Sequence, residues 1–139
     1  MNFLAHIYLS GNNEKLMVGN FIGDFVKGNQ LDSFEKEIKQ GVQLHRAIDQ
    51  YTDSHIVVSQ SKDKLREKYR HYSGVIVEVY YDHFLSKNWS HYHAQDLKGF
   101  TEEFYETIKS YTAILPERAA HMLPYMQQGN WLLNYSNIE

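Results

Sequence analysis

Three side chains that can bind a metal ion recur at four-residue steps in the stretch GVQLHRAIDQYTDSH, residues 41–55: His45, Asp49 and Asp53. On an α-helix such residues lie on one face, with Cβ atoms roughly 5 to 6 Å apart. One imidazole and two carboxylates on a face form half of a candidate metal site, and this ligand set suits Mn²⁺, Fe²⁺ or Zn²⁺. The alternative interpretation is a solvent-exposed ion pair on a surface helix.

The helix that must carry these residues is predicted from about residue 33 to about residue 58, with residues 59–61 as a short connection. Asp32 and Glu35 have the spacing of a capping box at its start. An apolar side that can be buried consists of Val42, Leu44, Ile48 and Tyr51.

Asn20 and Asp24 lie four residues apart in an apolar segment that predicts a helix beginning after Asn13 and ending at Gly28. Asp24 would then have apolar neighbours, which is a second candidate metal-binding position. The alternative interpretation is a packing face of small residues, with Asp24 exposed to solvent.

Residues 74–89, GVIVEVYYDHFLSKNW, are rich in β-branched and aromatic residues that favour a strand. We nevertheless predict a helix, because apolar residues recur at helical steps and no other segment offers a partner strand. Glu78 and Asp82 then share a face, and His83 follows Asp82 directly. Burying the side chains of an Asp-His dipeptide is costly unless they have partners or bind a metal. Asp82 is therefore the candidate that completes the site.

The remaining segments also predict helices, which makes the fold all-α. Residues 94–112 are predicted to form an amphipathic helix. Pro116 precedes another helical segment, which Pro124 interrupts, and residues 127–135 are the last apolar segment of the chain. We expect one compact domain, since 139 residues with 42% hydrophobic composition can bury a sizeable core.

Composition excludes several functional classes. The chain has no cysteine, which excludes disulfides, thiolate catalysis and Cys-ligated metals. A net charge of -3 gives the protein no overall basic character of the kind that nucleic-acid-binding proteins have. No apolar run approaches the roughly 18 residues of a membrane span, and the N-terminus lacks the basic region of a signal peptide. We therefore expect a soluble, cytoplasmic protein that binds neither nucleic acid nor membrane. Motifs of P-loop proteins, Rossmann folds and serine hydrolases are also absent.

The segment from residue 62 to residue 70 is basic. It is interpreted either as a solvated helix face or as a docking patch for an acidic partner or a phosphate. Its cations are Lys62, Lys64, Arg66, Lys68 and Arg70.

Several polar residues are each flanked by apolar residues, and the resulting motifs together resemble those of the acyl carrier protein phosphodiesterase family. The motifs, in chain order, are NFLAH at 2–6, GNFIGDFVKG at 19–28, GVQLHRAIDQYTDSH at 41–55, YYDHFLSKNW at 80–89, LP at 115–116 and WLLNY at 131–135. The resemblance implies a helical bundle like that of the HD-domain phosphohydrolases. It also implies hydrolysis of the 4′-phosphopantetheine arm from holo-acyl carrier protein, an acidic partner, with Mn²⁺ as the favoured metal and Mg²⁺ or Fe²⁺ as alternatives.

This resemblance and the metal chemistry together assign roles to the candidate residues. We expect the metal ligands to be Asp24, His45, Asp49 and Asp82. His6 and His83 are further ligands or proton-transfer groups. Arg46 is expected to grip a phosphoryl oxygen, Asp53 to orient His45 or the attacking water, and Asn20 to hold Asp24 by a hydrogen bond.

Two departures from the family pattern leave alternatives open. Glu78 stands where family members usually have Asp, and the single domain, residues 1–139, is shorter at its C-terminus than the family's members. The alternatives are a phosphohydrolase acting on a nucleotide or another small phosphoester, and a catalytically silent protein that binds acyl carrier protein through the basic segment. The oligomeric state is left open, a homodimer included.

Overall fold

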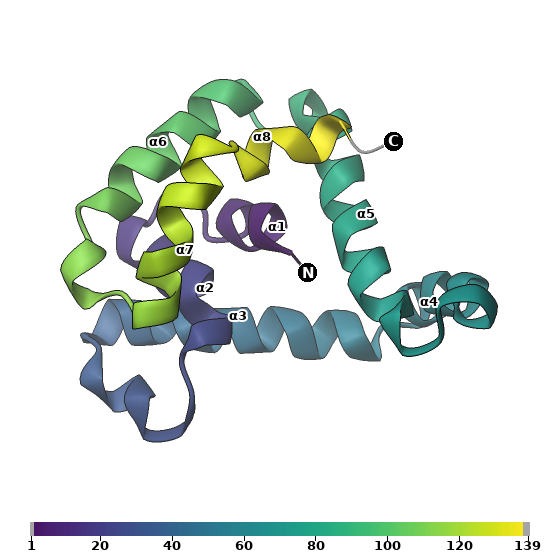
Figure 1. Cartoon of the computed structure of the whole chain (residues 1–139), viewed down its shortest axis with the longest axis horizontal. Coiled ribbons are helices and arrows are strands. Elements are labelled where there is room, and N and C mark those ends of the chain that lie inside the picture. The colour runs from purple at the N-terminus through teal and green to yellow at the C-terminus, as the bar shows by residue number, and fades with distance from the viewer. Residues whose placement is uncertain (1, 138–139) are drawn as a thin grey trace.

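The computed structural model describes residues 2–137, and this part of the chain is all-α, as expected (Figure 1). Its helices are α1 (Phe3–Tyr8), α2 (Glu14–Ile22), α3 (Lys36–Ser54), α4 (Ile56–Tyr69), α5 (Ser73–Lys87), α6 (Leu97–Lys109), α7 (Glu117–Gln128) and α8 (Trp131–Asn134). Short 3-10 turns join them, at η1 (Gly23–Phe25), η2 (Gly28–Ser33), η3 (Arg70–Tyr72), η4 (Trp89–His91), η5 (Thr112–Ile114) and η6 (Tyr135–Asn137). None of the described helices is long and apolar enough to cross a membrane.

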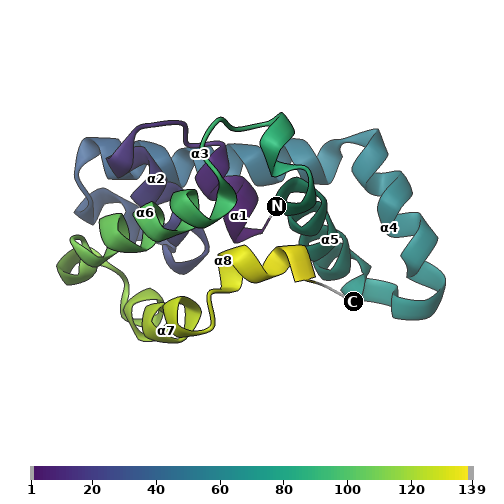
Figure 2. The same cartoon turned by 90° about the horizontal axis from the view of Figure 1, so that it is seen from above.

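The short helix α1 lies in the middle of the molecule, with α3 along one side and α6, α7 and α8 along the other (Figures 1 and 2). The helices α4 and α5 form the far end. Apolar side chains from α1, α2, α3 and the C-terminal helices close one core around α1, and its most deeply buried members are Leu4, Ile7, Phe21, Ile22, Val42, Phe104, Ile108, Met126 and Leu132.

Helices α2 and α3 are in backbone contact, because glycine stands on both sides of their crossing. A Cβ atom at Gly19 would overlap the carbonyl oxygen of Ile38, and one at Gly41 would overlap that of Leu16. The small-residue packing face considered for α2 is therefore present, and it fixes the separation of α2 and α3.

The predicted helix over residues 33–58 is two helices, so that prediction was wrong at both ends. Residues 59–61 lie inside α4, and the break falls at His55, whose backbone is extended and whose Nδ1 accepts the Val57 N–H at 3.1 Å. The capping box also does not form. Glu35 precedes α3 without a side-chain cap, and Asp32 instead pairs with Lys39 at 2.7 Å.

The helix predicted to run to Gly28 ends earlier, at Ile22, although its start after Asn13 is confirmed by the Asn13 side chain, which accepts the Leu16 N–H. Asp24 consequently lies on the turn η1 rather than on the face of α2 that carries Asn20. Helical structure is confirmed for residues 74–87, and Pro124 lies within α7 without ending it.

Candidate metal centre

Side chains from three segments meet beside α1: His6 on α1, Asp24 on η1, and His45 and Asp49 on α3. The His45 Nε2 atom lies 3.0 Å from Asp24 Oδ1 and 3.2 Å from Asp49 Oδ2, and His6 Nε2 lies 3.1 Å from Asp49 Oδ1. The two imidazole rings stack with centroids 3.8 Å apart. Ligand atoms of His6, His45 and Asp49 all lie within 4.8 Å of one another, so these three groups can hold one metal ion.

Asn20 fixes the tautomer of both imidazoles. Its side-chain Oδ1 accepts a hydrogen bond from His6 Nδ1 at 2.7 Å, and its backbone carbonyl accepts one from His45 Nδ1 at 2.8 Å. Because both Nδ1 atoms donate to Asn20 oxygens, Nε2 is the nitrogen of each ring that faces the carboxylates and is free to bind an ion. The Asn20 amide is itself held, since its nitrogen donates to the His6 carbonyl and to Ser10 Oγ. Metal-binding histidines are typically fixed in this way, so the donor set fits a divalent ion.

This role of Asn20 differs from the predicted one, which was to hold Asp24. The sequence did indicate that Asn20 needs a hydrogen-bond partner, since a side-chain amide in an apolar helix needs one when it is buried. Its partner could not be read from helical spacing, because it lies on a different helix.

Charge and burial act together on these groups. Burial lowers the pKa of His45, but hydrogen bonds to Asp24 and Asp49 outweigh it and raise that pKa to about 9. Burial opposes ionisation of Asp49, yet hydrogen bonds from His45 and His6 hold the Asp49 pKa well below its ordinary value. A hydrogen bond from His45 likewise lowers the pKa of Asp24. A proton on His45 Nε2 thus occupies the position that a cation would take.

Metal binding is therefore expected to release about one proton at pH 7, because His45 is protonated in the metal-free protein and a ligating imidazole must be neutral. Apparent affinity should rise about tenfold per pH unit between pH 7 and 8 and level off above pH 9. Titration calorimetry with Mn²⁺ in two buffers of different ionisation enthalpy measures the released proton. Equal heats in both buffers would contradict this picture.

The centre is closed on one side and open on the other. A Cβ atom at Gly23 would overlap the His45 ring, so glycine at this position makes room for the imidazole. The His6 and His45 side chains are 2% and 5% exposed, whereas those of Asp49 and Asp24 are 33% and 70% exposed. A substrate can therefore approach from the side of Asp24.

Asp82, predicted as a ligand, has a different place in the structure. Its two carboxylate oxygens accept the backbone N–H groups of Leu4 and Ala5, at 2.8 and 3.2 Å. Asp82 is completely buried, and burial raises its pKa to about 7 against the opposing effect of these two hydrogen bonds. It therefore holds the first turn of α1, the helix that carries His6, and does not join the described group of converging ligand atoms.

An Asp82→Asn variant should lose about 2 kcal/mol of unfolding free energy, because one amide NH₂ would face a buried backbone N–H. The loosened α1 should also weaken metal affinity by about tenfold, as loss of a supporting group does. Urea unfolding and metal titration measure the two effects. Unchanged affinity in the folded variant would show that α1 does not depend on Asp82 to position His6.

Three other predicted residues lie at the margins of the centre. His83 Nδ1 donates to the Tyr135 carbonyl at 2.6 Å, and His83 is also outside the converging group. Arg46 donates to the carbonyl of Val26, directly after η1, at 3.3 Å. Asp53 lies one turn beyond Asp49 and pairs with Lys62 at 3.5 Å, so the group that orients His45 is the Asn20 carbonyl rather than Asp53.

Glu78 is half-buried on α5, and burial raises its pKa. The negative charges of Asp49, Asp53 and Asp24 raise it further. Glu78 therefore belongs to the same electrostatic environment as the centre.

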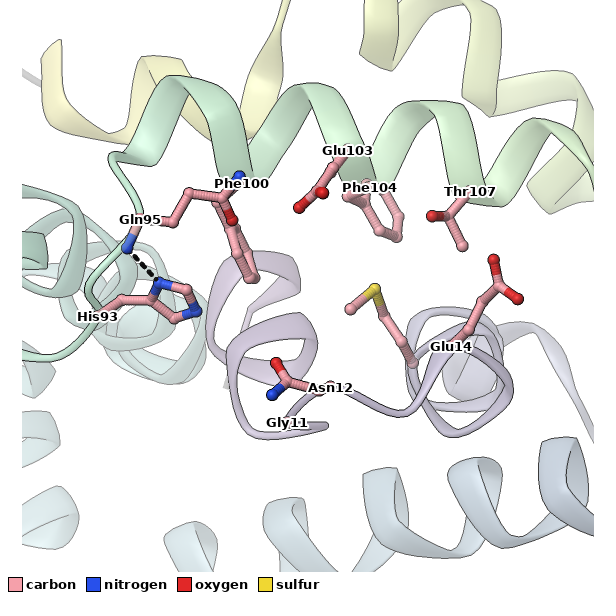
Figure 3. A pocket seen from close by; sticks show the side chains of 10 residues that line it. Gly11, Asn12, Glu14, His93, Gln95, Phe100, Glu103, Phe104 and Thr107 are labelled. Carbon is pink, nitrogen blue, oxygen red and sulfur yellow. Dashed lines mark hydrogen bonds between the residues drawn. The ribbon is translucent and has the colours of Figure 1, made fainter.

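A separate hollow of about 310 Å³ lies between the start of α2 and α6, and Figure 3 shows the carboxylates of Glu14 and Glu103 on its walls. His93 and Gln95 close one end, where the Gln95 N–H donates to His93 Nδ1 at 3.0 Å. None of the residues of the metal centre lines this hollow.

Comparisons with known proteins agree with the resemblance. The family model for acyl carrier protein phosphodiesterase matches residues 1–139. An acyl carrier protein phosphodiesterase of Photorhabdus laumondii is 30% identical over 139 residues, which cover 99% of this chain and 70% of that relative. Proteins of the same name from Escherichia coli O6:H1 and Pectobacterium atrosepticum are each 32% identical, over 72% of their length and at least 99% of this chain. No solved structure matches the chain significantly. The chain therefore belongs to the acyl carrier protein phosphodiesterase family.

Proposed function

We propose that this protein is a metal-dependent phosphodiesterase that hydrolyses the 4′-phosphopantetheine arm from holo-acyl carrier protein. The observation that carries the proposal is the convergence of two tautomer-fixed imidazoles and the Asp49 carboxylate in a member of this family. In the reaction a water oxygen bonds to phosphorus, the bond from phosphorus to the carrier's serine oxygen breaks, and that oxygen takes up a proton. The products are apo-acyl carrier protein and 4′-phosphopantetheine.

The ion would be held by His6 Nε2, His45 Nε2 and Asp49, with Asp24 as the fourth protein ligand on the open side. We propose Mn²⁺, with Fe²⁺ and Mg²⁺ as alternatives. Imidazole nitrogens beside carboxylates suit Mn²⁺ and Fe²⁺, whereas Mg²⁺ prefers oxygen ligands. A bound divalent ion lowers the pKa of a coordinated water and stabilises charge on phosphoryl oxygens.

The chain's own residues position the reactants. Asn20 keeps both Nε2 lone pairs directed into the centre. Arg46, beside the exposed edge of η1, is proposed to contact a phosphoryl oxygen. Asp53, one turn beyond Asp49, is proposed to orient the attacking water. We propose no ligand role for Asp82, because both of its oxygens are used by α1.

The basic segment on α4 and the start of η3 is proposed to steer the encounter with the acidic carrier. Its cations, Lys62, Lys64, Arg66, Lys68 and Arg70, are concentrated at the far end of the molecule beyond the C-terminal end of α3. Charges at the rim of an interface act mainly on the association rate and on its salt dependence.

The proposal is tested by incubating the protein with holo-acyl carrier protein and Mn²⁺ and following the mass of the carrier. Conversion to the apo mass, abolished by EDTA and restored by Mn²⁺, is the expected result. Binding of the carrier without loss of the arm would instead identify a catalytically silent binding protein. Turnover of small phosphodiesters or nucleotides without turnover of the carrier would identify a different phosphohydrolase.

A further inference from the structure

A hollow at the junction of α4 and α5 collects cations and contains no carboxylate in its lining. It has a volume of about 550 Å³ and is lined by Lys62, Arg66, Arg70, His71, Ser73 and Gly74. Lys62 and Arg66 are four residues apart on α4 and therefore face the same way, and Arg70, on η3 directly after α4, lines the same hollow, while Lys64 and Lys68 lie on the other side of α4. The hollow thus divides the basic segment into two faces.

A hydroxyl group lies in the wall of this hollow. Ser73 is 4% exposed and lines the hollow. Its hydroxyl makes no hydrogen bond to another residue of the described range 2–137. This oxygen is not among the fully buried side-chain atoms without a partner in residues 2–137, so it reaches the open space of the hollow and is available to a ligand.

Of the hollow's three strong cations, Arg70 is the one without a carboxylate partner in the part of the chain that the structure describes. Lys62 pairs with Asp53 at 3.5 Å and Arg66 with Asp63 at 3.1 Å, whereas Arg70 has no carboxylate partner within residues 2–137. Its backbone is held at φ 50° and ψ -123°, a conformation that non-glycine residues rarely adopt. Such strain is typical of positions that serve function.

We propose that this hollow binds the phosphate group of a small molecule, at a second anion site separate from the metal centre. The fork of an arginine, a lysine ammonium and a serine hydroxyl together match the oxygens of a tetrahedral anion. The largely buried Ser73 is within reach of a small phosphate ester that enters the hollow, whereas the broad surface of an acidic protein would contact mainly the exposed cations. This inference does not depend on the reaction at the metal centre.

The site is tested by NMR titration of the ¹⁵N-labelled full chain with inorganic phosphate and with glycerol phosphate, in EDTA so that no metal contributes. Amide shifts confined to residues 62–74 are expected. An Arg70→Gly variant should bind at least about tenfold more weakly, yet melt at a higher temperature because glycine relieves the positive φ. The matched control Lys64→Ala, on the other side of α4, should bind within about twofold of wild type.

Different affinities for the two probes would show whether an esterified or a free phosphate is the preferred ligand. Either preference supports the site. Shifts around His6 and His45 without shifts at residues 62–74 would overturn it. Binding of poly-glutamate but not of either phosphate would also overturn it and make the hollow a docking face for acidic protein. These outcomes are independent of carrier turnover, so they stand whether or not the proposed enzymatic function holds.

Discussion

Replacing Asp49 by Asn is expected to abolish turnover of holo-acyl carrier protein, by at least about a thousandfold, the scale on which loss of one charge-stabilising group acts. Asp49 is the carboxylate that contacts both imidazoles, with one oxygen 3.1 Å from His6 Nε2 and the other 3.2 Å from His45 Nε2. An amide keeps the size of the side chain but removes its charge. Metal affinity, measured by calorimetry, should fall by more than about a hundredfold, since a ligand counts for more than its supporting groups.

The matched control is Asp32→Asn, which removes one carboxylate from an exposed ion pair with Lys39. Exposed ion pairs contribute little to stability, so this variant should bind metal and turn over the carrier as wild type does. Wild-type metal affinity in folded Asp49→Asn protein would show that the ion is held elsewhere.

Replacing Gly19 by Ala is expected to destabilise the fold by at least about 3 kcal/mol, a large part of the total for a domain of this size. The added methyl group would overlap the Ile38 carbonyl oxygen, which belongs to the backbone and cannot turn away as a side chain can. Helices α2 and α3 must separate, and with them Asn20 and His45. Urea unfolding should show a lower midpoint, and metal affinity should fall as well.

Gly74→Ala is the control for this substitution. A Cβ atom there would lie 3.6 Å from Lys62 Cε, an ordinary contact. Alanine is also the better helix former, by up to about 1 kcal/mol. The two changes should therefore have opposite signs, and stabilisation by both would show that helix propensity, not overlap, governs position 19.

Local spacing predicted the part of the centre that lies on one helix. His45 and Asp49 are four residues apart in a strongly helical segment, and their side chains meet as expected. The helix around Asp82 was also predictable from its apolar periodicity. The partner of Asp82 was not, because a buried carboxylate is satisfied equally well by a metal or by the free N–H groups of a helix start. Those N–H groups belong to α1, far away in sequence.

Tertiary packing determines the positions of the residues that sequence reasoning placed incorrectly. Asp24 was expected on the same helix face as Asn20, but the chain turns at Gly23 to admit the His45 ring, and Asp24 reaches His45 from the turn. The break at His55 depends on an imidazole that caps α4, for which the usual capping residues give no signal. Hydrophobic periodicity does not encode either contact.

All residues that converge at the metal centre, from His6 to Asp49, precede α4 in the chain, whereas Asp82, which holds the start of α1, lies on α5. During synthesis from the N-terminus, the complete donor set therefore leaves the ribosome well before the group that anchors α1. Asn20, which holds the rings of His6 and His45, emerges together with them, whereas the first turn of α1 still lacks the carboxylate that accepts its N–H groups. The donor set and the amide that orients it are thus encoded ahead of α4, and α5 contributes only the support of α1, which arrives later.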